Sequence, residues 1–457
     1  MSSATAETTL KRTLSTRHIV YLGLAWMTPM IYFTVYGVAY ESAGGMLTQA
    51  YFLAFIAIFF TALSYGSMAR TFPTSGSAYT YVGKSMHPYL GYLVGWAILL
   101  DYLFSPLIAC LTFGLFLHAQ FPSVPLWVWV VSLNAVLAVI NIIGVSVSAM
   151  LSKWFVWIQM AFIAVFCFFL VRNLIGAEAA VSSPLQPLFQ TEVPIAAVLA
   201  GASVICFCFL GFDSVTTMSE ETIDSGRTIP RAILIIITLA SLLYLTPSYL
   251  TQLAHPNMAF DNVDTAGMEV VRLVGGSGLS ALFMTVVVFA VFTQGLSSFT
   301  TVSRLLYVFG RDAVLPKKVF GALHPKFRTP AVNIIIVAAF SMLALVISLD
   351  FAVKCVSFGA LTAFTFVNLS VILKLYIKEK RRSFKETILY LVCPLIGACF
   401  IGWLLSLLDG QALWLGMTWI AIGIVYYFFR YRIQPLFSGA KKQAAPGALT
   451  EDAPASP

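Results

Sequence analysis

The sequence predicts an all-α integral membrane protein with about twelve transmembrane helices. Of its 457 residues, 59% are hydrophobic and only 10% are charged, and the mean hydropathy is +0.89. Soluble domains carry about 25% charged residues, so this chain has more apolar side chains than a water-soluble core can bury. Apolar stretches of about 20 residues, the length of a helical span, recur along most of the sequence. The composition excludes a soluble enzyme, a disordered chain and a disulfide scaffold, and the stretch length excludes a transmembrane β-barrel.

The apolar stretches and the polar loops between them place twelve spans. We expect them near residues 18–40, 46–69, 88–118, 124–147, 153–172, 196–222, 230–252, 279–307, 331–349, 353–376, 388–408 and 412–431. The chain then divides into an N-terminal tail (1–16), a transmembrane domain (17–435) and a C-terminal tail (436–457). The C-terminal tail is rich in Ala, Pro and Gly without periodicity, which predicts disorder.

Basic residues fall on one side of the predicted membrane. If the chain starts in the cytoplasm, all 27 Lys and Arg residues except Arg172, Arg272 and Lys354 lie in cytoplasmic loops and tails. The positive-inside rule then places both termini in the cytoplasm. The net charge of +8 is explained by this topology and does not indicate nucleic-acid binding. The seven cysteines lie in or beside apolar segments and are interpreted as buried hydrophobic residues.

Two spans contain residues that interrupt a helix at mid-depth. Thr28 and Pro29 interrupt the first span, and Gly211, Phe212 and Asp213 interrupt the sixth. Interrupted helices five spans apart indicate an inverted repeat of five plus five helices with the binding site at the two breaks. The repeats would cover about 17–172 and 196–376, with two extra helices at 388–431. The alternative is that Pro29 is an ordinary kink and Gly211 an ordinary packing glycine, since both residue types are frequent in membrane helices.

Asp101 and Asp213 are carboxylates predicted to lie deep inside spans. Asp101 falls about 20 Å into a hydrocarbon core of about 30 Å, and Asp213 is at the break in span six. An ionised Asp at the bilayer centre costs about 3 kcal/mol, so each is predicted to face the bundle interior and to bind something. Either Asp could instead pair with a buried donor and be structural. Because the sequence places no Lys or Arg at mid-span, we expect the positive charge to come from the substrate.

Aromatic residues flank both breaks and both carboxylates. Rings and carboxylates together bind ammonium groups by cation–π attraction and charge-assisted hydrogen bonds. In a chain with 14% aromatic residues, most rings serve packing, so Tyr102 and Phe212 are preferred over the others. The predicted substrate-binding residues are Trp26, Thr28, Tyr32, Asp101, Tyr102, Gly211, Phe212 and Asp213.

Glu220 and Glu221 follow Asp213 toward the cytoplasm, at a helix C-terminal end where the helix dipole disfavours them. They have two interpretations. Either they pair with Arg227 or Arg231 as loop anchors, or they form an inner gate or a station for the coupled proton.

Two carboxylates facing one empty cavity repel each other, so at least one of Asp101 and Asp213 is expected to hold a proton without substrate. Symport then needs a second protonation point, for which Glu220 and Glu221 are the nearest candidates.

Four segments resemble the amino acid–polyamine–organocation (APC) superfamily of transporters, and the bacterial putrescine importers in particular. They are SVICFCFLGFDSVTTMSEETIDSGRTIPRAIL, FTALSYGSMARTFPTSGSAYTYV, GWAILLDYLFSPLI and SRLLYVFGRDAVLPKKVFGALHPKFRTPAVN. The resemblance covers roughly residues 15–430. It implies the LeuT-like inverted-repeat fold with broken helices 1 and 6, a substrate site between spans 1, 3, 6 and 8, and proton-coupled uptake.

The sequence departs from the amino-acid-transporting members at two places. Those members have a Gly-rich break in span one whose N–H groups hold the substrate carboxylate. Here no glycine lies between Gly23 and Gly37, and Pro29 has no N–H to donate. This favours a substrate that is only cationic, such as a diamine. Some members also carry a Lys inside span five, where this chain has Gln159, so a carboxylate could carry the proton instead.

These observations predict a secondary active transporter that imports putrescine or a related polyamine across the bacterial cytoplasmic (inner) membrane. The alternative is a cationic or neutral amino acid permease of the same fold. The sequence shows no channel filter, metal or catalytic cluster, or nucleotide-binding loop, so we expect neither an enzyme nor an ATPase subunit. No cofactor or metal is expected, and the proton gradient is the expected energy source. The expected partners are a small cation and the lipid bilayer, while monomer and dimer both remain open.

Overall fold

The computed structural model is helical throughout the part of the chain that it describes. The described residues are 12–176, 184–189, 193–256, 258–261, 263–408 and 410–431. Within these ranges the extended contacts are limited to one isolated bridge, between Leu14 and Thr222. Most of both predicted tails, including all of 436–457, lies outside the described residues.

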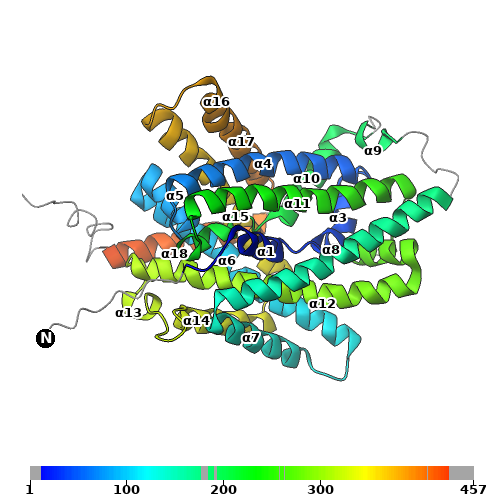
Figure 1. The fold of residues 1–457 in the computed structure, drawn as a ribbon, viewed down its shortest axis with the longest axis horizontal. Helices are drawn as coiled ribbons and strands as arrows, with labels where there is room; N and C mark the ends of the chain where they lie inside the picture. Colours follow the sequence, from blue (N-terminus) through cyan, green and yellow to red (C-terminus); the bar gives the residue numbers. More distant parts are fainter. Residues whose placement is uncertain are drawn as a thin grey trace, which may run out of the picture.

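The long helices run side by side along the longest axis of the molecule (Figure 1). They are α4 (Leu47–Thr71), α6 (Pro88–Gln120), α7 (Leu126–Ile143), α8 (Val145–Gly176), α11 (Ser225–Ala254), α12 (Ala266–Arg311), α15 (Leu349–Val371) and α18 (Gly410–Tyr431). The remaining α-helices are α1 (Thr16–Met27), α2 (Ile31–Thr34), α3 (Tyr36–Ser42), α5 (Ser77–Ser85), α9 (Gln186–Phe189), α10 (Ile195–Cys206), α13 (Lys317–Phe320), α14 (Ala331–Ser341), α16 (Phe384–Thr387) and α17 (Cys393–Ser406).

Six shorter segments have other helical geometries. The 3-10 helices are η1 (Phe207–Phe209), η2 (Ser214–Glu221), η3 (Val263–Thr265) and η4 (Met342–Leu345), and the π-helices are η5 (Ile372–Lys378) and η6 (Ile388–Val392).

Ten helices of the described chain are long and apolar enough to cross a membrane. A further span results if the bent pair Thr16–Thr34 and Tyr36–Ser42, which meet at 65°, is counted as one, and Ala331–Leu345 is a shorter apolar helix. This confirms the prediction of a multi-pass, all-helical membrane protein. Large apolar side chains on the outer helices, among them Trp127, Trp154 and Trp414, are exposed, as expected where a helix faces lipid.

Glycines with a positive φ lie near the start of two predicted spans. The span expected at 153–172 belongs to α8, which begins at Val145 directly after Gly144 (φ 151°). The span expected at 279–307 belongs to α12, which begins at Ala266 and continues across a kink at Gly276, where φ is 68°. Glycine adopts these positive φ values without steric cost. At Gly144 α7 ends and α8 begins, whereas the part of α12 after the Gly276 kink begins close to the expected start at 279.

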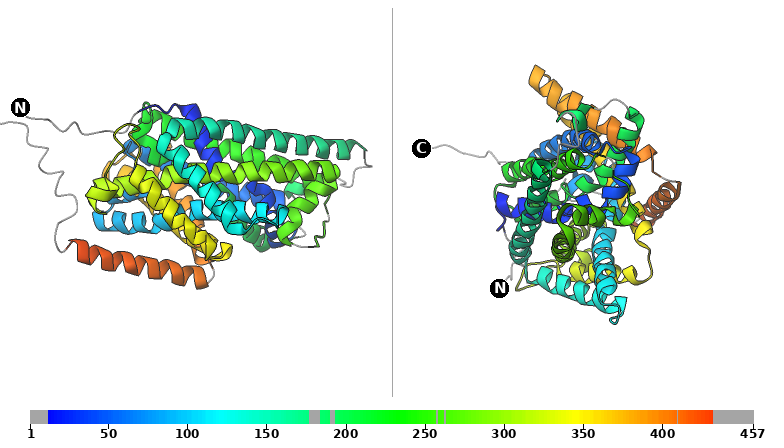
Figure 2. Two further views of the ribbon diagram at one scale, coloured as in Figure 1. Left: turned by 90° about the horizontal axis from the view of Figure 1, so that it is seen from below. Right: turned by 90° about the vertical axis from the view of Figure 1, so that its right-hand side faces the viewer.

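The middle of the bundle is formed by α6, which packs against α5, α7, α12 and α15. The bundle is completed by α4 packed on α11, and by α1 packed on α8, α11 and α12. At the edge, α17 packs on α15 and α4, and the turns around α16 project beyond the other helices, as the end-on view shows (Figure 2). The central helices therefore surround the two broken segments, α1–α2 and α10–η2.

Candidate functional site

The first break lies between α1 and α2. Thr28 has a φ of 51°, a strained value for a residue that is not glycine. Its Oγ1 donates hydrogen bonds to the carbonyl oxygens of Ala25 (3.1 Å) and Trp26 (3.3 Å). Pro29 follows without an N–H, and the helix resumes at Ile31. The structure confirms a break at Thr28 and Pro29, with the Thr28 side chain satisfying carbonyl groups at the end of α1.

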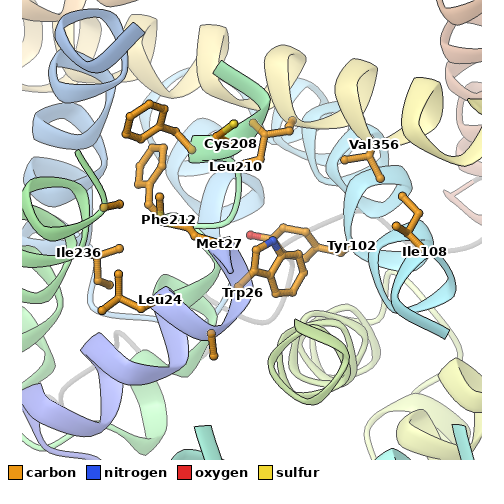
Figure 3. Close-up of a cluster of buried hydrophobic side chains, with 14 of the residues drawn as sticks. Leu24, Trp26, Met27, Tyr102, Ile108, Cys208, Leu210, Phe212, Ile236 and Val356 are labelled. Carbon is orange, nitrogen blue, oxygen red and sulfur yellow. The ribbon is translucent and has the colours of Figure 1, made fainter. Parts of the chain in front are cut away.

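The second break lies between η1 and η2 and touches the first. Gly211 has a φ of 105°, in the region that favours glycine. A Cβ atom at this position would overlap the indole ring of Trp26. Figure 3 shows Trp26 between the end of α1 and Tyr102 of α6, with Phe212 on the other side of the broken segment. The glycine therefore permits both the turn and the close approach of the two broken helices.

Asp213 follows this break and is completely buried. The hydroxyl of Tyr102 donates a 2.8 Å hydrogen bond to its Oδ2. Its Oδ1 has no hydrogen-bond partner in the part of the chain that the structure describes. The rings of Trp26 and Tyr102 pack edge to face with centroids 5.5 Å apart. Asp213, Tyr102 and Trp26, predicted from three different spans, are thus brought together.

Asp101 is also completely buried, on the turn of α6 that carries Tyr102. Ser105 Oγ donates hydrogen bonds to its Oδ1 (3.2 Å) and its backbone oxygen (2.8 Å), whereas Oδ2 has no partner among the described residues. Gly359 of α15 packs so closely that an added Cβ would lie 2.8 Å from the Asp101 nitrogen. Tyr102, the next residue of α6, donates a hydrogen bond to Asp213, which places the two carboxylates on either side of one tyrosine. The two carboxylates therefore belong to one charged site.

Two tyrosines that the sequence analysis did not select also belong to this site. Tyr65 of α4 packs edge to face on Phe212, with ring centroids 5.4 Å apart, and interacts electrostatically with both carboxylates. Tyr81 of α5 lies beside Tyr65 and interacts with Asp213. Both hydroxyls are buried without a hydrogen-bond partner in the described chain. Their segment was recognised by its family resemblance, but neither residue stands at a break or beside a charge in the sequence.

Tyr32 lies in a second aromatic cluster. Its ring centroid is 5.7 Å from that of Tyr51, which lies 5.9 Å from Tyr244. Phe209, another ring near the second break, packs on Tyr244 at 5.4 Å. The structure gives Tyr32 no contact with Asp101 or Asp213. Of the predicted aromatic residues, Trp26, Tyr102 and Phe212 are therefore the ones placed around the carboxylates.

Glu220 and Glu221 pair with arginines of α12 rather than with Arg227 or Arg231. Glu220 Oε1 accepts a 2.7 Å bond from Arg311 Nη1, and Glu221 accepts two 3.0 Å bonds from the Arg304 guanidinium. The expected loop anchors are wrong: η2 packs on both α11 and α12, and the arginines that reach its two acids come from α12. Arg227 forms a longer, exposed contact of 3.9 Å with Asp224 instead.

The N-terminal segment closes over the same end of η2. The backbone N–H groups of Thr13 and Leu14 both donate to the Glu221 oxygen, and the N–H of Ile223 donates to the Leu14 oxygen. Ser75, in the loop between α4 and α5, exchanges hydrogen bonds with Glu220. The N-terminal segment, the loop between α4 and α5, and α12 therefore all meet η2 at these two acids.

Arg304 is completely buried inside α12, where the sequence analysis had counted it as a loop residue. Its guanidinium binds Glu221 and the Thr300 oxygen, so it is not a partner of Asp101 or Asp213.

Gln159 of α8 is also completely buried, and both amide atoms lack a partner among the described residues. Within those residues, no three His, Cys, Asp or Glu side chains are grouped to hold a metal ion.

Comparisons with known proteins agree with this architecture. The amino acid permease family model matches residues 18–440. The chain is 39% identical over 428 residues to the low-affinity putrescine importer PlaP of Escherichia coli K12, covering 92% of this chain and 94% of that protein. It is 24% identical over 463 residues to the branched-chain amino acid permease BcaP of Bacillus subtilis, covering 94% and 96%. Mouse cationic amino acid transporter 4 is 28% identical over 397 residues, covering 81% of this chain and 61% of that protein.

The matched region contains both breaks, both buried carboxylates and the arginines of α12. It also contains the four segments whose resemblance pointed to the same superfamily. The chain therefore belongs to the amino acid permease family, within the APC superfamily of transporters.

Proposed function

We propose that this chain is a secondary active transporter that imports putrescine or a related polyamine. The observation that carries the proposal is the pair Asp101 and Asp213, two completely buried carboxylates that are linked through Tyr102, the neighbour of Asp101 and a donor to Asp213. Burying an uncompensated charge is expensive, and the buried cation Arg304 is already bonded to Glu221. A substrate with two ammonium groups supplies the missing charge. The identity with a putrescine importer over most of the chain supports the same substrate class.

In the proposed binding mode, one ammonium group lies at Asp213 and the other at Asp101. Asp213 Oδ1 and Asp101 Oδ2 have no partner in the described chain, so each can accept a charge-assisted hydrogen bond. Trp26, Tyr102 and Phe212 lie around Asp213, and the face of an aromatic ring attracts a cation. Thr28 and Gly211 are the other two predicted site residues. They stand at the two breaks, where backbone groups lie outside regular helix and would be available to the substrate. Tyr32 packs in the second aromatic cluster, so it would not contact the substrate and would affect binding only through packing.

We further propose twelve spans arranged as a five-plus-five inverted repeat with two appended helices. Support comes from the positions of the breaks, at 28–30 and at 210–213, on the first and sixth apolar segments. The positive-inside pattern supports cytoplasmic termini and insertion in the bacterial inner membrane. In that orientation Glu220 and Glu221 lie on the cytoplasmic side of the site, where their ion pairs with α12 would form an inner gate.

Proton coupling is the energy source that we propose. The two buried carboxylates support it, because repulsion in an empty site favours a bound proton that an arriving cation would displace. The test is putrescine accumulation in sodium-free proteoliposomes with an imposed pH gradient. We expect accumulation that an uncoupler abolishes, whereas equal accumulation after the gradient collapses would exclude the mechanism. Glu220→Gln and Glu221→Gln variants would then show whether either acid carries the coupled proton.

A cationic or neutral amino acid permease is the alternative, supported by the amino acid permeases among the relatives. Competition of putrescine uptake by free amino acids separates the two functions. A diamine transporter is expected to be inhibited by cadaverine and spermidine and to ignore leucine. Inhibition by leucine or arginine at equal concentrations would favour the alternative.

Asp213→Asn tests the site directly, because the amide fits the same space and cannot carry the charge. We expect it to lose most putrescine binding while still folding. The matched control is Asp224→Asn, which changes an exposed carboxylate 11 residues away in sequence and should leave binding unchanged. Binding by Asp213→Asn within twofold of the parent would refute the assignment.

A further inference from the structure

A cavity of about 580 Å³ lies outside the substrate site, between α4, α11 and the connection from η5 to η6. It is distinct from the site of Asp101 and Asp213, since neither carboxylate lines it. One part of the cavity is lined by polar and charged side chains and the other by apolar ones. Ser67, Arg70, Thr71 and Arg381 line the polar part, whereas Leu63, Leu234 and Leu389 line the apolar part.

Positive charge is concentrated at the polar part. Arg70 occupies the last turn of α4, is exposed, and forms no ion pair within the described chain. Arg381 contacts Glu379 at 2.8 Å, but the same carboxylate also contacts Lys374 at 3.4 Å. The segment 374–385 contains six Lys and Arg residues and Glu379 as its one acid. This end of the cavity therefore has a surplus of positive charge, which would repel a cationic substrate.

The apolar part lies at membrane depth. Arg70 is near the end of the apolar helix α4, so it is placed at the membrane surface. Leu63 precedes it by about two helical turns, or about 10 Å along the axis. Figure 1 shows α16 above α4. Arg381 precedes α16 in the sequence and Leu389 follows it, and both line the cavity. The cavity thus offers cations at the surface and aliphatic side chains beneath them.

We propose that this cavity binds an anionic phospholipid, with the phosphate between Arg70 and Arg381 and the upper acyl chain against Leu63 and Leu389. Basic pockets between membrane helices at the positively charged end of a protein bind anionic lipid headgroups. Guanidinium groups suit phosphate because they present parallel N–H donors. The hydroxyls of Ser67 and Thr71 donate to the Leu63 and Ser67 carbonyl oxygens of α4, so the two guanidinium groups are the donors proposed for the phosphate. A lipid here would connect α4 and α11 to the projecting turns around α16.

Native mass spectrometry of the full chain in detergent tests the proposal, with phosphatidylglycerol and phosphatidylcholine of identical acyl chains as probes. We expect phosphatidylglycerol to be retained preferentially. Each of Arg70→Gln and Arg381→Gln is expected to lower its retention about fivefold, which corresponds to about 1 kcal/mol per basic residue near an anionic surface. Lys318→Gln removes an exposed charge of α13 that does not line the cavity and should change nothing.

Two further variants separate the contribution of charge from that of the apolar part of the cavity. Arg70→Lys should retain most binding, and Leu389→Trp, which fills the apolar part, should lower it without changing the charge. Thermal unfolding of each variant checks folding, and the conclusion rests on those that unfold as the parent does. Equal retention of both lipids, or no effect of either arginine variant, would overturn the proposal. Displacement of the lipid by soluble glycerol 3-phosphate would also overturn it, because the ligand would then be a free phosphate compound.

Discussion

Glu221→Gln is expected to destabilise the protein far more than Glu220→Gln, although the residues are adjacent and the chemical change is identical. The Glu221–Arg304 pair has two 3.0 Å hydrogen bonds, and its side chains are 4% and 1% exposed. Removing one charge leaves Arg304 buried without a counter-charge, which costs about 3–5 kcal/mol. The Glu220–Arg311 side chains are 24% and 36% exposed, and such a pair contributes about 0–1 kcal/mol.

The difference between the two variants should therefore be about 1–4 kcal/mol, after about 1 kcal/mol is added for the hydrogen bond from the Ser75 N–H to the Glu220 carboxylate. The free energy of unfolding can be measured in mixed micelles by titration with sodium dodecyl sulfate, with tryptophan fluorescence as the signal. The double variant Glu221→Gln with Arg304→Gln removes both charges and is expected to recover part of the lost stability. Equal losses for the two single variants, or a double variant less stable than Glu221→Gln alone, would refute the burial argument.

Three further predictions concern the substrate site. Asp101→Asn should weaken putrescine more than butylamine in competition binding, because only the diamine has a second ammonium group, and equal weakening would refute the two-carboxylate mode. Tyr102→Phe removes the 2.8 Å hydrogen bond to Asp213 and should weaken binding about threefold to tenfold, near 1 kcal/mol, in the same assay; unchanged binding would contradict this role. Gly211→Ala should abolish uptake, since its Cβ overlaps the Trp26 ring, and normal uptake would show that the break is not required.

The sequence predicted the features that depend on local chemistry. Hydropathy identified the spans, and Pro29 and Gly211 identified the breaks because one lacks an N–H and the other adopts a positive φ. The depth of Asp101 followed from its position along an apolar helix. These inferences need only the chain near each residue, and the structure confirms the breaks and the burial of both carboxylates.

The contacts between distant segments could not be predicted in the same way. Arg304 lies 83 residues from Glu221, and Tyr102 lies 111 residues from Asp213. Whether two such residues meet depends on the rotation of each helix about its axis, and a helix that is apolar on all sides gives no periodic signal for that rotation. Tyr65 was missed for this reason. The partners of Glu220 were assigned wrongly because the nearest arginines in sequence were not the nearest in space.

Glu221 links the N-terminal segment to α12 through two different groups of one residue. Its carboxylate binds α12 while its backbone oxygen accepts the N–H groups of Thr13 and Leu14. A displacement of η2 that releases Arg304 also removes the acceptor that fixes the N-terminal segment. The same residue therefore holds the chain just before the first helix and the end of α12 together. A bulky group attached at Thr13 would disturb the surroundings of the Glu221–Arg304 pair from a residue far away in sequence.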